Sequence, residues 1–522
     1  MLCAGGYTGA SIRQERGSQE FDRQMIAHKY AVKMLASILS SVLAFISLMV
    51  MTRYVGTEYG IMMWAFSFVA LFNSVADLGF SSAHIRSISS GEDQNRCITT
   101  YIVIKIILTA VFAVSLLATI MIQGVIGSGY NEEMIAIVLS FLVYYVIFNL
   151  TGIMTQTYIA RMEAGKDAVV IITESTIRSV CLIILAFMGV SAVVLSTSYI
   201  IGGVSALIVC LMMFKNVRYR PAKPLKIREY VRFTAPLALA AVLVTAMGSL
   251  DRVLIGIFCG DADVGFYSAA MGVIYAMIAV GTVFNGILLS HLSGLNAESR
   301  TDDIRSTLWS VQKYVSILIL PPTMFMIIFG TEVSTILFGA GYSSSGDILS
   351  VLAIGAYILT MLGALIQILN TFGKTRIYGR ISVVYAAIAL FTLFLFIPDE
   401  IFGIKALGLG PVGAALSVVV SNAVCLILVG VMVVKTTKIR MYSRLYIHLM
   451  ASAASIATAY IVKNYVGISG LISGLLVLAL TVSVYFLVLV LTKEFGKKDI
   501  KFISEVMNVR EAYGGFKDEM KK

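Results

Sequence analysis

The stretch SLDRVLIGIFCGDADVGFYSAA, residues 249–270, indicates the fold of the whole chain. It starts in an apolar run, passes the adjacent charges Asp251 and Arg252, and turns at a glycine and two aspartates into a second apolar run. Apolar runs joined by such short polar turns are typical of a chain that crosses a membrane repeatedly. Two opposite charges inside such a run need a polar cavity or partners.

The composition of the 522 residues extends this interpretation to the whole sequence, because 58% are hydrophobic and only 13% are charged, whereas about one quarter of a soluble domain is charged. A membrane-spanning helix needs about 20 apolar residues. Runs of this kind follow one another at 31–51, 59–80, 99–121, 134–156, 168–188, 191–214, 233–258, 264–289, 309–329, 347–370, 378–397, 408–434, 446–466 and 470–491. We therefore predict an all-α polytopic membrane protein with about fourteen transmembrane helices.

The basic residues orient these helices, because Lys and Arg collect in cytoplasmic loops. With the N-terminus inside, the clusters KNVRYRPAKPLKIREYVR (215–232) and KTTKIRMYSR (435–444) both fall on the cytoplasmic side. The external loops then hold roughly three basic residues against roughly thirty on the other side. We predict a multi-pass protein of the plasma (inner) membrane with both termini cytoplasmic. The net charge of +11 favours anionic lipid headgroups as partners and does not indicate nucleic acid.

The chain also repeats itself. RYVGTEYGIMMWAFSF (53–68) matches IFCGDADVGFYSAAMG (257–272), GYNEE (129–133) parallels GYSSSGD (341–347), and GVSAVVLS (189–196) parallels GPVGAALS (410–417). All three matches are displaced by six helices, and six is even, so the two halves are expected to run parallel about an axis along the membrane normal.

The repeat predicts two six-helix bundles followed by two further C-terminal helices. In folds of this kind the substrate path lies between bundles that rock against each other. The predicted parts are a cytoplasmic N-terminal segment (1–30), an N-terminal six-helix bundle (31–214), a basic linker (215–232), a C-terminal six-helix bundle (233–434), two additional helices (435–491) and a cytoplasmic tail (492–522).

A few charges fall inside the predicted spans, where an isolated charge costs about 2.5–3.5 kcal/mol. Glu174 and Arg178 have the spacing of a same-face helical pair, whereas the adjacent Asp251 and Arg252 point about 100° apart. We expect one of Asp251 and Arg252 to face a polar cavity between the halves. Lining of a cavity and structural pairing between helices are both compatible with these four residues.

Four further charges fall within the predicted spans, and three of them have an alternative role near the cytoplasmic surface. Lys105 lies within its span, Asp77 lies near a helix end where it could orient the turn, and Lys33 and Lys313 can extend to the interface.

The sequence lacks the motifs of several other classes. The six cysteines and four histidines show no metal-ligand spacing, and GKT (373–375) lacks the first glycine of a phosphate loop, whose place is taken by Ile368. We therefore expect no cofactor and no metal, and a secondary transporter rather than an enzyme. Its energy would come from an ion gradient, H⁺ or Na⁺, or from the gradient of the substrate.

Several motifs, taken in order, carry a resemblance to a known family. They are RYVGTEYGIMMWAFSFVALFNSVADLGFSSAHIR (53–86), SLDRVLIGIFCGDADVGFYSAA (249–270), LFGAGYSSSGDILSVLAIGAYI (337–358), NTFGKTR (370–376) and GLGPVGAALS (408–417). With these motifs the chain resembles the polysaccharide transporter family, which includes the O-antigen flippases, within the multidrug/oligosaccharidyl-lipid/polysaccharide (MATE-like) exporter superfamily.

The resemblance implies a fourteen-helix flippase for surface polysaccharide or glycan assembly. Such a protein moves a polyprenyl-diphosphate-linked oligosaccharide from the inner to the outer leaflet by alternating access. It further implies that Arg252, Arg178 and Lys105 contact diphosphate or acidic sugars. The acids Asp251, Glu174 and Asp77 would then be counter-ions or carriers of a coupling ion.

Three alternatives stay open at this point. A cation-coupled multidrug exporter and a peptidoglycan-precursor flippase belong to the same superfamily. A membrane-embedded glycan polymerase or ligase would need a large external loop, and every predicted external loop is short. For the flippase, polymerase or ligase machinery is an expected partner, together with the lipid-linked substrate and the bilayer.

Overall fold

The computed structural model describes residues 33, 36–56, 58–126, 131–224, 227–297, 300–401, 403–465, 471–496 and 499. Within these residues, 14 helices are long and apolar enough to cross a membrane, from Ala36–Tyr54 to Ile472–Leu491. The prediction of an all-α polytopic protein is confirmed. The predicted segment 1–30 lies outside the described residues, and the predicted tail is described only at 492–496 and 499.

The first half of the chain contains six spans and a short helix that does not span. Its second span ends early, passes through one 3-10 turn and continues as the ten-residue helix α3. Local capping explains other boundaries: Asn131 accepts a hydrogen bond from the Met134 amide and thereby starts α5. After the first span, Ala36–Tyr54, the elements are α2 (Glu58–Asn73), η1 (Ser74–Ala76), α3 (Phe80–Ser89), α4 (Gln94–Ile126), α5 (Glu132–Ala160), α6 (Ala164–Phe187), α7 (Ala192–Phe214) and η2 (Lys215–Val217).

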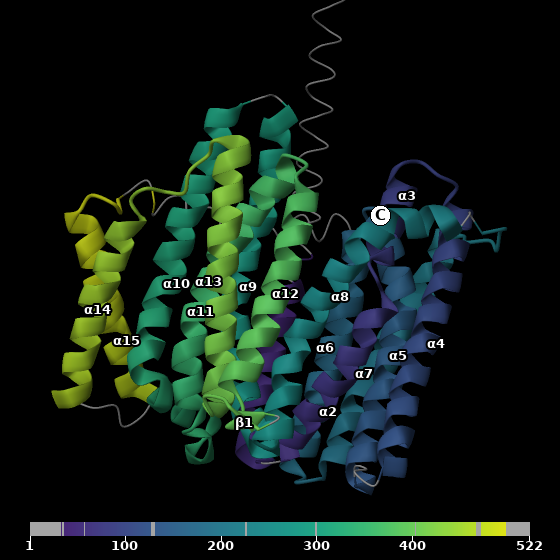
Figure 1. Cartoon of the computed structure of the whole chain (residues 1–522), viewed down its shortest axis with the longest axis horizontal. Coiled ribbons are helices and arrows are strands. Elements are labelled where there is room, and N and C mark those ends of the chain that lie inside the picture. Colours follow the sequence, from purple (N-terminus) through teal and green to yellow (C-terminus); the bar gives the residue numbers. More distant parts are fainter. Residues whose placement is uncertain are drawn as a thin grey trace, which may run out of the picture.

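The second half repeats this order of spans, and its second and third spans, α9 and α10, are longer than their counterparts α2 and α4. Its elements are α8 (Ile227–Phe258), α9 (Asp261–Ala297), α10 (Thr301–Phe338), η3 (Ala340–Tyr342), α11 (Ser345–Thr371), α12 (Thr375–Phe396), β1 (Glu400–Ile401), β2 (Ile404–Lys405) and α13 (Gly410–Thr437). The two short strands pair antiparallel between α12 and α13. We call the end of the molecule that carries them the hairpin end and the opposite end the α3 end (Figure 1).

Two further helices, α14 (Leu445–Tyr465) and α15 (Leu471–Leu491), complete the chain. They pack on each other and on α10, and so form one edge of the molecule beside the second half (Figure 1). The two bundles stand side by side with their helices running between the same two ends. Two parallel six-helix bundles with two C-terminal helices are therefore the observed architecture, as the sequence repeat predicts.

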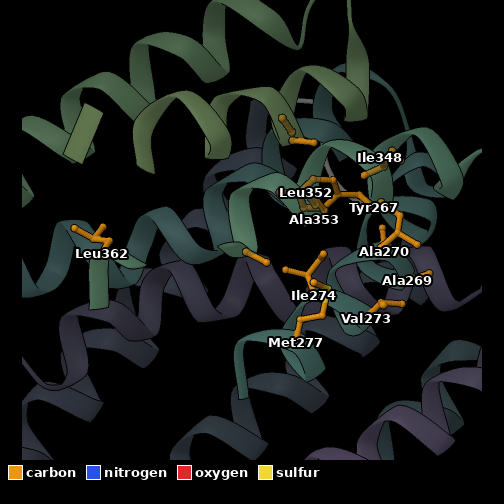
Figure 2. Close-up of a cluster of buried hydrophobic side chains, with 14 of the residues drawn as sticks. Tyr267, Ala269, Ala270, Val273, Ile274, Met277, Ile348, Leu352, Ala353 and Leu362 are labelled. Carbon is orange, nitrogen blue, oxygen red and sulfur yellow. The ribbon is translucent and has the colours of Figure 1, made fainter. Parts of the chain in front are cut away.

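Small residues let helices approach closely inside the second half. Figure 2 shows Tyr267, Ala270 and Ile274 of α9 beside Leu352 and Ala353 of α11, all of them buried. In a membrane such contact is stabilised by close van der Waals packing, because lipid tails are as apolar as the side chains. The α9–α11 contact belongs to the main hydrophobic core.

The two halves meet where α2 packs against α8 and α9. At Gly60 of α2, an added Cβ would lie 2.0 Å from the carbonyl oxygen of Asp261. At Gly256 of α8, an added Cβ would lie 1.9 Å from the Trp64 ring. Only glycine permits such close approach, so these residues fix a tight seam between the halves at the hairpin end.

Candidate functional site

A cavity of about 550 Å³, with charged side chains set in a mostly apolar wall, lies in the first half and extends to α8 of the second half. The end of α2 and helices α4, α5, α6 and α7 form its wall, and Ala241 and Thr245 of α8 complete it. Five charged side chains of the described residues line it: Lys33, Asp77, Lys105, Asp167 and Glu174. A cavity at this depth gives polar groups a place among apolar spans.

Lys105 and Asp77 face each other in this cavity. The Lys105 ammonium lies 3.1 Å from the Asp77 carboxylate, and their side chains are 7% and 40% exposed. The ammonium also donates to the carbonyl oxygen of Ala76 at 3.0 Å and to the amide oxygen of Asn149 at 3.3 Å. Both charges are candidates from the sequence alone, but their pairing is not, because the end of α2 and α4 come together only through tertiary packing.

Glu174 and Arg178 pair along one face of α6, as their spacing predicts. The distance from Arg178 Nε to Glu174 Oε1 is 2.8 Å. The guanidinium also lies over the Tyr199 ring of α7, 5.0 Å from its centroid. Gly202 of α7 makes room for this contact, because a Cβ there would come within 2.8 Å of the Arg178 Cβ. Glu174 reaches the cavity wall and Arg178 lies behind it.

A third ion pair of the cavity joins Lys33 to Asp167, at 2.8 Å. The Asp167 side chain is only 5% exposed, whereas that of Lys33 is 37% exposed. Sequence reasoning assigned Lys33 to the interface and missed Asp167, although an aspartate in the first turn of a spanning helix was a signal for a buried partner. Each acid that lines the cavity therefore has a basic partner.

Asp251 and Arg252 lie in the seam between the halves and are both buried. Arg252 donates to Ser67 of α2 at 3.4 Å and to the Tyr275 hydroxyl of α9 at 3.0 Å. Asp251 accepts from the Tyr267 hydroxyl at 2.7 Å and from the Arg252 amide at 2.8 Å. The expectation was that one of them would face the cavity, but neither is among its lining residues. Neither side chain needs the cavity, because hydrogen-bond partners on α2 and α9 hold both of them within the seam.

Further contacts across the seam close the hairpin end. The Tyr342 hydroxyl, which follows α10, donates to the Gly56 carbonyl oxygen at 2.9 Å. Arg53 of the first span donates in return to the carbonyl oxygens of Ile336 and Leu337 at the C-terminal end of α10. Arg53 thus satisfies carbonyl groups at the C-terminal end of α10, and Tyr342 adds a second donor to the Gly56 carbonyl, which also accepts from the Tyr59 amide. The cavity lies on the other side of this closure, with Gly79 and Ser81 at the α3 end among its lining residues.

The family model described as "Polysaccharide biosynthesis protein" matches residues 50–347. No curated protein matches the sequence. Among solved structures, the "Lipid II flippase MurJ, inward closed conformation" is 12% identical, with 87% of this chain and 97% of that chain covered and a TM-score of 0.68. An inward-facing multidrug resistance MATE family transporter of the MOP superfamily is 14% identical, covering 78% and 99%, with a TM-score of 0.56. At these identities the likeness shows a shared fold.

Proposed function

We propose that this chain, which belongs to the polysaccharide biosynthesis protein family, is a transporter that carries a polyprenyl-diphosphate-linked oligosaccharide from the inner to the outer leaflet. The observation that carries the proposal is a charged cavity placed among membrane spans, on one side of a closed seam. A polar headgroup cannot cross about 30 Å of hydrocarbon unaided, and such a cavity replaces part of its hydration.

The cavity supports binding of a charged group by exchange of partners. Lys105, which lines the cavity, would contact the diphosphate or acidic sugars, and Arg178 would have to turn from behind the wall to reach them. Asp77 and Glu174 would act as counter-ions when the site holds no substrate. Because every lining acid is paired, an entering anion has to take a base from its acid. Binding then replaces charge-assisted hydrogen bonds to the acid with charge-assisted hydrogen bonds to the anion, and the released acid takes up a proton or the coupling ion.

Alternating access would require the seam at the hairpin end to open. In this transporter the two bundles rock against each other, and the contacts of Arg252, Arg53 and Tyr342 break when the cavity turns outward. Asp251 and Arg252 then belong to the gate rather than to the binding site. The positive-inside bias places the α3 end in the cytoplasm, so the state described here would be closed to the outside.

The remaining assignments follow from the same proposal. The chain would act in the plasma membrane with both termini cytoplasmic, without catalysing a covalent step. The lipid-linked unit would pass to polymerase or ligase machinery at the outer face. Its energy would come from an H⁺ or Na⁺ gradient or from removal of the transported unit.

Deletion of the gene in its own host tests the proposal. Polyprenyl-linked oligosaccharides would be extracted, identified by mass spectrometry and assigned to a leaflet by their accessibility in sided membrane vesicles. We expect a finished, untransferred unit to accumulate on the inner leaflet and to disappear when the wild-type gene is restored. Unchanged glycolipids with altered drug sensitivity would favour a multidrug exporter, and accumulation of a peptidoglycan precursor would favour the third alternative.

A further inference from the structure

The Lys105 ammonium sits in a small cage of oxygen atoms. Three of them lie within hydrogen-bond distance: the Asp77 carboxylate at 3.1 Å, the Ala76 carbonyl at 3.0 Å and the Asn149 amide oxygen at 3.3 Å. The three oxygens come from the end of α2 and from α5, whereas the lysine comes from α4. Lys105 therefore enters a site built by other helices.

A break in α2 supplies two of these oxygens. The α-helix ends at Asn73 and is followed by one 3-10 turn, Ser74–Ala76. Helical backbone cannot continue beyond this turn, because Leu78 and Gly79 both adopt left-handed backbone angles, with φ of 50° and 80°. The last carbonyls of an interrupted helix have no partner further along the chain and so are free to accept other donors. Ala76 is one of them, and Asp77 adds its side chain at the same point.

The third oxygen is aimed at the ammonium by a second hydrogen bond. The amide nitrogen of Asn149 donates to the side-chain oxygen of Asn73 at 2.7 Å. This contact fixes which way the Asn149 amide faces and turns its oxygen toward Lys105. Both asparagines line the cavity, so the cage opens onto the same water-accessible space.

A carboxylate, a backbone carbonyl and an amide oxygen make up the chemistry that proteins use for hard cations, and unwound helix ends supply such ligands in membrane carriers. We propose that the end of α2 is a monovalent-cation site whose occupant is the chain's own Lys105 ammonium. Distances of 3.0–3.3 Å suit an ion of ammonium or potassium size, and exceed the roughly 2.3–2.6 Å that oxygen ligands keep from Ca²⁺.

A tethered cation has a consequence for the transport cycle. While Lys105 occupies the site, the negative charge of Asp77 is balanced without any ion from solution, so an ion has to bind only when the lysine leaves. Removing the ammonium while keeping the cage converts the site into one for a free cation. The inference concerns the charge balance of the protein itself and does not rest on the identity of the transported lipid.

The experiment measures thermal unfolding of the purified full chain in the chlorides of ammonium, potassium, sodium and choline at equal ionic strength. The wild-type Tm should not distinguish these cations. Lys105→Ala should unfold at a lower temperature and recover roughly 2 °C with saturating ammonium or potassium, less with sodium and nothing with choline. A Tm of Lys105→Ala that is the same in all four salts would overturn the proposal.

Two control variants separate the cage from a general effect of charge. Lys33→Ala removes a lysine that contacts one carboxylate at the cavity edge, so its Tm should show no preference among the cations. Lys105→Ala combined with Asp77→Asn keeps the space but removes the charged ligand, and should lose the cation response. A response that persists in the double variant would contradict the site.

Lys105→Met guards against a variant that does not fold, because it keeps most of the side-chain volume. The Tm of Lys105→Met should rise in ammonium and potassium, less in sodium and not in choline, as expected for Lys105→Ala. If it can be purified only with a cation present, recovery of folded protein in ammonium chloride but not in choline chloride supports the site. Equal recovery in both salts counts against it.

Discussion

Helices α2 and α9 are equivalent in the two halves, yet they begin alike and end differently. Both start at the hairpin end, where the backbone of α2 at Gly60 touches that of α9 at Asp261. Toward the other end α2 breaks after 16 residues, whereas α9 continues for 37. The shared start makes the seam, and the broken end of α2 lines the charged cavity of the first half.

The sequences at the two ends are related, which makes the difference informative. Gly79 and His84 recur as Gly286 and His291 at the same spacing of 207 residues, and the residue at the place of Asp77 is Phe284. Gly79 is left-handed, whereas Gly286 is helical. The half that breaks its helix also carries the acid, so the break and the carboxylate occur together.

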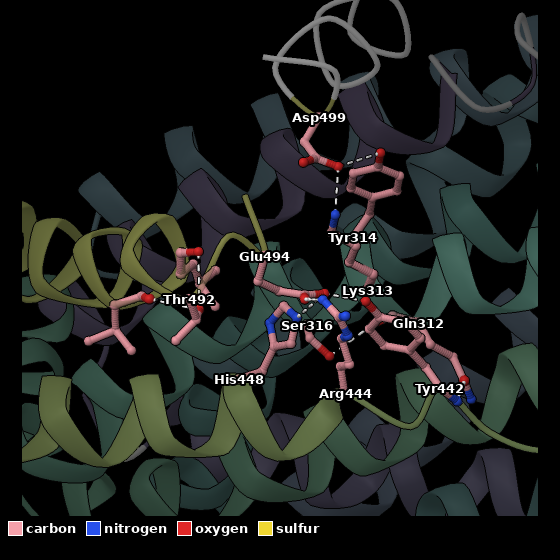
Figure 3. Close-up of polar contacts among 12 residues, drawn as sticks. Gln312, Lys313, Tyr314, Ser316, Tyr442, Arg444, His448, Thr492, Glu494 and Asp499 are labelled. Atoms are coloured by element: carbon pink, nitrogen blue, oxygen red, sulfur yellow. Dashed lines mark hydrogen bonds and ion pairs between the residues drawn. The ribbon is translucent and has the colours of Figure 1, made fainter. Parts of the chain in front are cut away.

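A lysine recurs as well, and the two halves bind it differently. Lys313 of α10 follows Lys105 of α4 by 208 residues. Because α9 has Phe284 at the place of Asp77, Lys313 finds its acid elsewhere: it contacts Asp499 of the C-terminal tail at 2.7 Å, and the Tyr314 hydroxyl donates to the same carboxylate at 3.0 Å (Figure 3). Lys105 therefore lines a cavity because the broken end of α2 supplies oxygen atoms that accept from its ammonium, whereas Lys313, beside the unbroken α9, binds the tail instead.

The largest loss of stability and transport is expected at the hairpin end, where α2 and α9 begin and touch each other. Gly60→Leu would drive a side chain into the Asp261 carbonyl, a backbone atom that cannot move aside as a flexible side chain could. Overpacking of this kind should cost about 3 kcal/mol or more and abolish transport, because the hairpin end can no longer close. A lowered Tm measures the cost.

Gly124→Leu is the matched control for Gly60→Leu, since an added Cβ at Gly124 meets no atom within 4 Å. It should leave the Tm and transport close to wild type. Equal Tm losses in the two variants would mean that the seam does not depend on the glycine contact.

The second prediction compares the stability lost when Lys105 or Lys313 is removed. Lys105→Ala leaves three oxygens without their shared donor and should lower the free energy of unfolding by about 1–3 kcal/mol. Lys313→Ala should lower it by about 1 kcal/mol or less, because it frees only the tail. Denaturation of the two variants under the same conditions checks the order, and a larger loss for Lys313→Ala would contradict it.

A third prediction concerns the helix break itself. Gly79→Ala places a side chain on a left-handed residue and should cost about 1–2 kcal/mol. Gly286→Ala falls on helical backbone in α9 and carries no such strain. Thermal unfolding of the two variants measures the difference, and an equal or greater loss for Gly286→Ala would mean that the break is not what distinguishes the helices.

The smallest effect is a pH dependence at the tail. Burial raises the pKa of Asp499, but hydrogen bonds from Lys313, the Gly496 amide and Tyr314 outweigh it and hold this pKa below its usual value. The contact therefore stabilises the protein fully above the unfolded pKa of about 3.9 and is lost as the pH falls through the folded value.

Asp499→Asn should remove this acid-dependent contribution, of about 1 kcal/mol or less, and leave transport intact. The stability of wild type and variant would be compared between pH 7 and pH 3. A difference that grows as the pH falls would be the opposite of the expected result. Asp302→Asn is the control, because that exposed residue also pairs with a base but lies far along the chain from the tail.

Much of the fold follows from the sequence, because apolar length and charge bias are local signals. The fourteen spans and the six-helix repeat are predicted in this way, although several helices run longer than their apolar centres; α10, for example, extends over Thr301–Phe338 where 309–329 was predicted. The non-spanning helix α3 was missed, since it is amphipathic and directly follows an apolar run.

The site was predictable only where its geometry is local. Glu174 and Arg178 pair through helical spacing, which the sequence displays. The contact of Lys105 with Asp77 depends on where α2 breaks and which helix lies beside it, and no spacing rule contains that information. The burial of Arg252 in the seam likewise depends on the rotation of α8, which packing against α2 and α9 sets.

The most direct test of the account restores the deleted gene as wild type, Lys105→Ala or Lys313→Ala and measures the sidedness of the polyprenyl-linked oligosaccharide in each strain. Transport through the first-half cavity predicts inner-leaflet accumulation in the deletion and Lys105→Ala strains, and wild-type distribution with Lys313→Ala at matched protein levels. A normal distribution in the deletion strain, or equal accumulation with both lysine variants, would contradict it.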